Sequence, residues 1–169
     1  PKEIKNLNIT MGYPFKYSSV FSLFNVVLKI HSKKQKNYYY KNIFSILSHE
    51  LIKPILNKDK DICLIIKKNN LIYISKNELI ELDKKNSEIY ELLFSKWADL
   101  TIGIKSCIQL IDLLKKHYNK KKIKDNINLE FLYNAYKIFN QIMVFVENYK
   151  SIKNINSLRT MYKEIGEMN

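Results

Sequence analysis

The chain has 169 residues, which is enough for one domain with a single hydrophobic core. Hydrophobic residues make up 46% of it, as in an average globular domain, so the composition excludes disorder over most of the length. The formal charge of +13 favours polyanionic partners. The three glycines and three prolines are too few for the many turns of an antiparallel β fold, and this favours helices.

Lysine carries nearly all of the positive charge, because Arg159 is the only arginine. Base-specific readout of DNA prefers the bidentate fork of arginine, so the composition disfavours sequence-specific recognition. Two explanations of the lysines stay open. Some of them contact DNA phosphates, or they reflect an AT-rich genome, which the abundance of Lys, Asn, Ile and Tyr also indicates.

The first expected element is a short strand or extended lead-in over residues 4–10, where apolar and polar residues alternate. Gly12 and Pro14 interrupt the chain after it. Ser18 or Ser19 then serves as the N-cap of the first expected helix.

Two apolar stripes at helical spacing come next, over residues 20–31 and 43–55. The basic stretch 33–37 ends the first helix, and cations there suit the helix dipole. Pro54 interrupts the second stripe unless a new helix begins just before it.

The middle of the chain gives less regular signals. Residues 62–66 are apolar and ambiguous between helix and strand, whereas residues 71–74 are the best strand candidate in the body of the chain. Ser75 then begins a helix, and Glu78 three residues later completes a capping box.

Apolar stripes predict four further helices, over residues 89–97, 104–118, 129–146 and 155–165. Gly166 is the expected stop of the last helix, and residues 115–124 are the expected lysine-rich linker between the second and third. The expected fold is therefore all-α, an irregular bundle of seven or eight helices in a single domain over residues 1–169. At most a minor β element is expected, near residues 4–10 or 71–74.

No known catalytic pattern is recognised. His31, His49 and His117 are far apart and form no metal-binding pair, and no two carboxylates demand an acid–base interpretation. Cys63 and Cys107 lie among apolar residues without a partner at metal-site spacing, so we expect buried, reduced thiols in a reducing, cytoplasmic setting. No apolar run reaches the roughly 20 residues of a membrane span. The sequence predicts no catalytic residue, no metal and no cofactor.

Two lysine clusters are candidates for DNA contact. The first surrounds Tyr38-Tyr39-Tyr40 and combines charge with stacking surfaces, as single-strand binders do, unless some of the tyrosines seal the core instead. The second is the densest positive patch of the chain, unless it is only a solvated loop. The candidate lysines are Lys33, Lys34, Lys36, Lys115, Lys116, Lys120, Lys121, Lys122 and Lys124.

A family resemblance is carried first by residues 8–15, NITMGYPF, which resemble the N-[IV]-T-M-G-Y-P-L stretch of AddB-type proteins. These are inactivated superfamily I helicase-like proteins with a C-terminal PD-(D/E)XK nuclease domain. In bacteroidete-like members a helix follows, and then an aromatic-rich segment with a leucine–serine–histidine-like turn, which YYKNI at 39–43 and ILSH at 46–49 resemble. Phe15 replaces the usual leucine, and Glu50 stands where proline often follows the histidine.

The resemblance implies a helical insertion similar to the 2B-type accessory domain of superfamily I helicases. Such a domain is noncatalytic and positions DNA and neighbouring domains or subunits in double-strand break repair and recombination. Its implied partners are DNA, bound nonspecifically, the rest of the parent helicase–nuclease polypeptide and its partner subunit. The chain begins at Pro1, and we expect it to be an insert excised from such a larger protein.

The alternative is an independent helical protein-interaction module that uses an exposed apolar or aromatic patch. Its candidate residues are Tyr38, Tyr39, Tyr40 and Trp97. A standalone enzyme is disfavoured, because no site is recognised.

Overall fold

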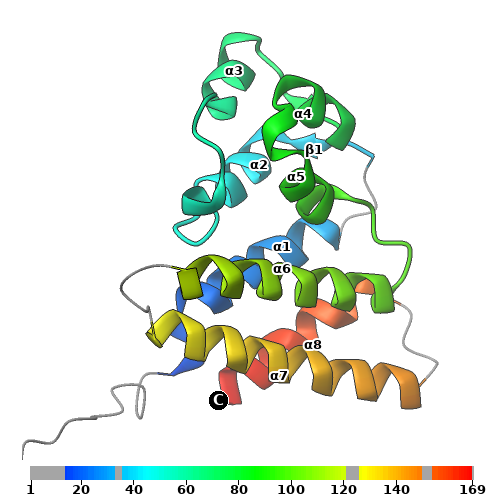
Figure 1. Ribbon diagram of the computed structural model, residues 1–169. Coiled ribbons are helices and arrows are strands. Elements are labelled where there is room, and N and C mark those ends of the chain that lie inside the picture. The colour runs from blue at the N-terminus through cyan, green and yellow to red at the C-terminus, as the bar shows by residue number, and fades with distance from the viewer. Residues whose placement is uncertain (1–13, 33–35, 121–125, 150–153, 169) are drawn as a thin grey trace, which may run out of the picture.

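The computed structural model of the protein describes residues 14–32, 36–120, 126–149 and 154–168. This part of the chain contains eight α-helices and one small antiparallel sheet (Figure 1), so the prediction of an all-α fold with seven or eight helices is confirmed. The expected strand over residues 4–10 lies outside the described residues. The helices are α1 (Ser19–His31), α2 (Tyr40–Leu47), α3 (Ile62–Lys68), α4 (Lys76–Leu82), α5 (Ser87–Phe94), α6 (Leu100–Lys120), α7 (Asn126–Asn148) and α8 (Ile155–Met168).

Two groups of elements pack on each other (Figure 1). The first, called the four-helix part, consists of α1, α6, α7 and α8, with α6 and α7 running antiparallel side by side. The second, called the upper part, contains α2 to α5 and the strands β1 (Tyr38–Tyr39) and β2 (Tyr73–Ile74). It sits over α6 and is joined to the four-helix part through α1 and α5.

Local capping fixes several helix starts where the sequence places them. The Ser18 side chain accepts a hydrogen bond from the Phe21 N–H at 3.1 Å and caps α1. Ser75 and Glu78 form the predicted capping box at the start of α4, with hydrogen bonds in both directions. Asp61 caps α3, which resolves the ambiguous residues 62–66 as helix.

A cluster of aromatic rings fills the core of the four-helix part. The Tyr162 ring of α8 is stacked between Phe21 and Phe139, with centroids at 5.2 and 5.1 Å. Gly166 lies beside this stack, because an ideal Cβ there would come within 2.5 Å of the Phe21 ring. The expectation that Gly166 stops the helix is therefore wrong: α8 continues to Met168, and the missing side chain allows close packing.

The two parts meet at the C-terminal end of α5, where the last carbonyls of a helix have no partner within it. The Leu93 carbonyl lies 2.9 Å from Nε2 of His31, and since a carbonyl only accepts, Nε2 carries the proton. The Tyr38 hydroxyl donates to the Phe94 carbonyl at 2.9 Å. Trp97 stacks on the His31 ring with centroids 3.8 Å apart. We call His31, Tyr38, Trp97 and these two carbonyls the junction.

Gly103 allows α6 to close the junction from below, and replacing it provides the first test. An ideal Cβ at Gly103 would lie 2.7 Å from Cε3 of Trp97, so Gly103→Ala must displace the indole. We expect a loss of about 1–3 kcal/mol in the free energy of unfolding, because overpacking outweighs the better helix propensity of alanine. Urea unfolding measures it, with the exposed α6 variant Gln109→Ala as control. Equal stability of Gly103→Ala and wild type would contradict the packing.

The junction also predicts a pH dependence of stability. Burial lowers the pKa of His31 from 6.5 to about 4, although its hydrogen bond to the Leu93 carbonyl acts in the opposite direction. Between these values the unfolded chain binds a proton that the folded chain does not, so the free energy of unfolding falls as the pH falls through this window. The contribution of His31 is up to about 3 kcal/mol.

Chemical unfolding at a series of pH values from 4 to 7 measures this effect. His49 contributes in the same direction, because burial also lowers its pKa. The control is His31→Phe, which keeps an aromatic ring against Trp97 but cannot titrate. We expect a shallower slope for this variant, and an unchanged slope would show that His31 does not carry the effect.

Candidate nucleic-acid interface

The predicted DNA-contacting lysines fall into two groups in the structure. Lys36 is exposed just before β1, and Lys115, Lys116 and Lys120 lie in the last two turns of α6. The remaining candidates lie outside the described residues: Lys33, Lys34, Lys121, Lys122 and Lys124.

The expectation of a linker from residue 115 is wrong up to Lys120, because the chain there is still helical. The reason is tertiary packing. Leu114 and Tyr118 are buried and extend the apolar stripe of α6 towards the loop. Lys115 and Lys116 are thereby held on a rigid helix, with Lys116 exposed and Lys115 half-buried.

Lysines and tyrosines interleave where α6 packs on α7, in a set that we call the lysine–tyrosine face: Lys115, Tyr133, Tyr136 and Lys137. The Lys115 ammonium lies 4.7 Å from the Tyr136 ring centroid and 6.0 Å from that of Tyr133. Lys137, one turn after Tyr133 on α7, places its ammonium 5.0 Å from the same ring. Two cations therefore lie beside Tyr133, whose side chain is 53% exposed.

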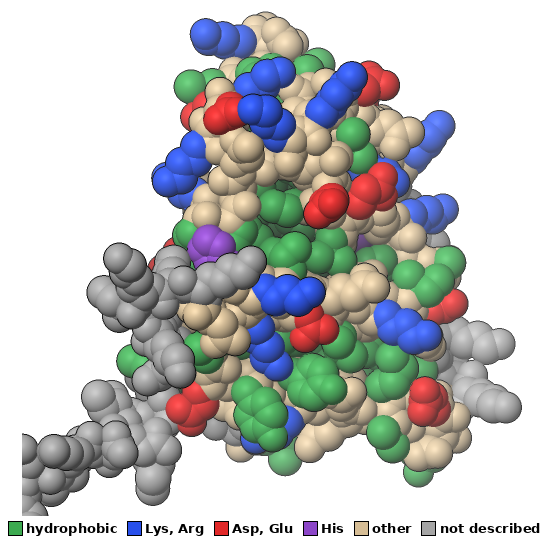
Figure 2. All heavy atoms as spheres, in the orientation of Figure 1, with side chains coloured by type: hydrophobic (Ala, Val, Ile, Leu, Met, Phe, Trp, Pro, Cys, Tyr) green, Lys and Arg blue, Asp and Glu red, His purple; other side chains and the backbone are tan. Residues whose placement is uncertain are grey.

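The charge on this face is partly open to solvent, because Lys137 is exposed and Lys115 is half-buried. Figure 2 shows lysine side chains spread among hydrophobic ones, with single acidic side chains between them, on the face that α6 and α7 present to the viewer. Lysine ammonium groups contact phosphate as point charges, and an exposed tyrosine ring adds a flat contact surface. The arrangement suits a polyanion whose backbone is held without reading its sequence.

The three consecutive tyrosines, Tyr38, Tyr39 and Tyr40, do not form one exposed surface. Tyr38 is buried, donates its hydroxyl to the junction, and has its pKa raised to about 12 by burial. Trp97 is buried as well, so neither residue can belong to the exposed patch that the interaction-module alternative required. Tyr39 and Tyr40 are half-buried. The alternative that some of the tyrosines seal the core is confirmed for Tyr38.

The cysteines are free thiols, and burial raises the pKa of both. Cys107 is fully buried as expected, whereas Cys63 is half-buried.

Among the described residues no group of three or more His, Cys, Asp or Glu side chains is placed to hold a metal ion. None of the described helices has the length and apolar character needed to cross a membrane. Comparisons with protein-family models, curated proteins and solved structures return no match for the chain.

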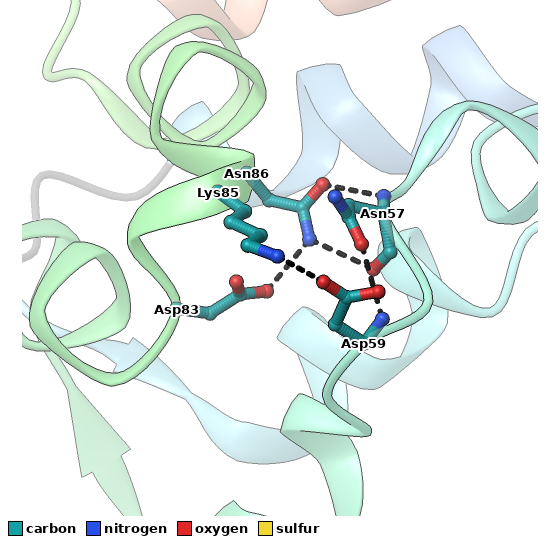
Figure 3. Close-up of polar contacts among 5 residues, drawn as sticks. All are labelled: Asn57, Asp59, Asp83, Lys85 and Asn86. Carbon is teal, nitrogen blue, oxygen red and sulfur yellow. Dashed lines mark hydrogen bonds and ion pairs between the residues drawn. The ribbon is translucent and has the colours of Figure 1, made fainter.

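A polar cluster around buried Asp83 and Asn86 in the upper part was not predicted from the sequence (Figure 3). The Asn86 amide accepts from the Asn57 N–H at 2.7 Å and donates to the Asn57 carbonyl at 3.1 Å and to Asp83 Oδ2 at 2.6 Å. The Tyr90 hydroxyl also donates to Asp83 Oδ2, at 2.8 Å, and Lys85 pairs with Asp59. The cluster fastens the loop before α3 to the α4–α5 connection.

The role of this cluster is structural, because its donors and acceptors are directed at one another (Figure 3). Burial, followed by the hydrogen bond to Asp83, raises the pKa of Tyr90, which keeps this phenol protonated. In the sequence, the only sign of the cluster is the polar segment 83–86 between two apolar stripes. This segment predicts an ordinary turn, because its partner Asn57 is distant in sequence.

Replacing Asn86 tests the structural role. Asn86→Ala leaves the N–H and carbonyl of Asn57 without their partner and removes one of the two hydrogen bonds to Asp83 Oδ2, so we expect a loss of about 1–3 kcal/mol in the free energy of unfolding. The matched control is Asn77→Ala at an exposed position of α4, with an expected change within about 0.5 kcal/mol. Thermal and urea unfolding measure both, and equal effects would show that the cluster does not anchor the loop.

Proposed function

We propose that the chain is a noncatalytic accessory domain of the 2B type from an AddB-type helicase–nuclease. In this role it positions DNA and neighbouring domains or subunits during double-strand break repair and recombination. The observation that carries the DNA contact is the lysine–tyrosine face, in which Lys115 and Lys137 lie beside exposed Tyr133. The choice of family rests on the resemblance of residues 8–15 and 39–49.

Affinity in this proposal comes from lysine–phosphate contacts. Each phosphate that a lysine neutralises releases a counterion, so binding weakens steeply as salt rises. Lys116 follows Lys115 on α6 and is exposed, although it lines the groove towards α5 together with Glu88, Glu91 and Asp112. Lysine in place of arginine supports nonspecific binding, as expected for a domain that must accept any DNA end.

The scaffold role is supported by apolar side chains at the end of α7. Val144, Phe145 and Tyr149 are 58%, 43% and 56% exposed, and the Phe145 and Tyr149 rings lie 4.6 Å apart. Such a cluster favours contact with another protein surface. In the proposed setting that surface belongs to the rest of the parent polypeptide or to its partner subunit.

Fluorescence anisotropy with a labelled blunt duplex across a salt series tests the DNA contact. We expect binding that weakens as salt rises. The slope of log affinity against log salt concentration should become shallower by about 2 when Lys115 and Lys137 are both changed to Gln, because each lost phosphate contact removes about 0.9. The control is the double variant Lys58→Gln/Lys84→Gln, which removes the same charge from exposed positions of the upper part.

Undetectable binding of the wild type at low salt would remove the DNA role. Equal slopes for the two double variants would show that charge, and not the lysine–tyrosine face, determines binding.

A further inference from the structure

The small sheet separates neighbouring tyrosines onto opposite faces. Tyr38 pairs with Ile74 and Tyr39 pairs with Tyr73 in the antiparallel register. Since successive side chains of a strand point to opposite faces, Tyr38 and Ile74 turn inward and are buried, whereas Tyr39 and Tyr73 share the outer face. The hydrogen bond from Tyr38 to the Phe94 carbonyl holds β1 in this orientation, with Tyr39 and Tyr73 outside.

The rings on this outer face form a continuous row that extends onto α2. The Tyr73 and Tyr39 centroids are 5.7 Å apart, those of Tyr39 and Tyr40 are 4.8 Å apart, and those of Tyr40 and Phe44 are 5.4 Å apart. We call these four residues the aromatic row. Tyr73 is 62% exposed, and neighbouring Ile72 is 57% exposed, so one end of the row is open to solvent.

The end of α3 gives the row its shape. Asn70 adopts a left-handed conformation with φ of 50°, the Leu71 N–H donates to the Ile66 carbonyl, and the Asn70 N–H donates to the Lys67 carbonyl. These bonds form a helix-terminating Schellman turn, which sends the chain directly into β2. The turn and two members of the row, Tyr39 and Tyr40, line an open groove of about 390 Å³, and exposed Tyr73 lies next to Ile72 of its lining.

The charge around this groove suits an anion. Lys67 lines the groove and holds its ammonium 5.4 Å from the Phe44 ring centroid, and the Lys41 ammonium lies 6.0 Å from that of Tyr40. No carboxylate is among the described residues that line it. The groove between α5 and α6 differs, because it is lined by three carboxylates, those of Glu88, Glu91 and Asp112.

We propose that the aromatic row is a binding site for single-stranded DNA, in which unpaired bases stack on Tyr39, Tyr40 and Tyr73 while Lys41 and Lys67 contact the phosphates. Stacking on aromatic rings next to cations binds any base, because every base has a flat face. A duplex cannot use the row, since its bases are already paired and stacked. The identification of the nucleic acid as DNA rests on the proposed function, whereas the stacking site rests on the row itself.

The aromatic row and the lysine–tyrosine face make separable contributions. The face lies on α6 and α7 and offers charge to a backbone, whereas the row lies in the upper part and offers rings to bases. Losing stacking should therefore affect single strands and leave duplex affinity unchanged.

Anisotropy with a labelled oligothymidylate and with a blunt duplex, at one low salt concentration, tests the proposal. We expect Tyr73→Ala to weaken oligothymidylate binding about 5- to 100-fold and to leave duplex affinity unchanged within about twofold. Tyr73→Phe keeps the stacking ring and should bind as the wild type does. The matched control is Tyr17→Ala, which removes a tyrosine of similar exposure, 64%, from the segment just before α1.

Unchanged oligothymidylate affinity in Tyr73→Ala overturns the inference, as does an equal loss for the duplex. Circular-dichroism melting verifies that the variant is folded, and Tyr39→Ala provides an independent variant of the row. The wild type could bind oligothymidylate but not the duplex, with Tyr73→Ala removing that binding. This result would support the single-strand site on the aromatic row and refute the proposed duplex contact at the lysine–tyrosine face. If light scattering shows a wild-type dimer that Tyr73→Ala dissociates with unchanged oligothymidylate affinity, the row is a protein interface and the inference is wrong.

Discussion

The last two carbonyls of α5 tie together segments that are far apart in the chain. Each accepts a hydrogen bond from a buried side chain, His31 at the end of α1 and Tyr38 in β1. A buried carbonyl without a partner costs about 1–3 kcal/mol, so both side chains have one favourable position. The inward position of Tyr38 also fixes the outward position of Tyr39, because the side chains of a strand alternate. A hydrogen bond in the interior thus determines which rings reach the surface.

The two proposed DNA surfaces are related through this same contact. The lysine–tyrosine face belongs to the four-helix part, and the aromatic row belongs to the upper part. Trp97 is packed against the His31 ring and against the backbone of α6 at Gly103, so the two parts are in close contact here. The two proposed contacts, with the backbone and with bases, therefore lie on parts that are packed together, which agrees with the proposed positioning role.

Features that depend on near neighbours in sequence could be predicted, whereas those that depend on distant partners could not. The Ser75–Glu78 capping box and the Ser18 cap involve residues three positions apart, and both are present. The Asn86 contact with Asn57 joins residues 29 positions apart, and its pattern reads as an ordinary turn. Among the site residues, Lys115 was identified by charge. Its aromatic neighbours on α7 were not, because the packing of α6 on α7 decides which side chains meet.

Trp97 is the only tryptophan of the chain, and it lies against His31, whose neutral form is favoured by burial. An indole in contact with an imidazole has an emission that depends on the protonation of that ring. Tryptophan fluorescence, excited selectively over that of the twelve tyrosines, therefore comes from a single, known place, the contact between the two parts of the molecule. The protein carries its own optical reporter of whether those parts remain docked, without an attached dye.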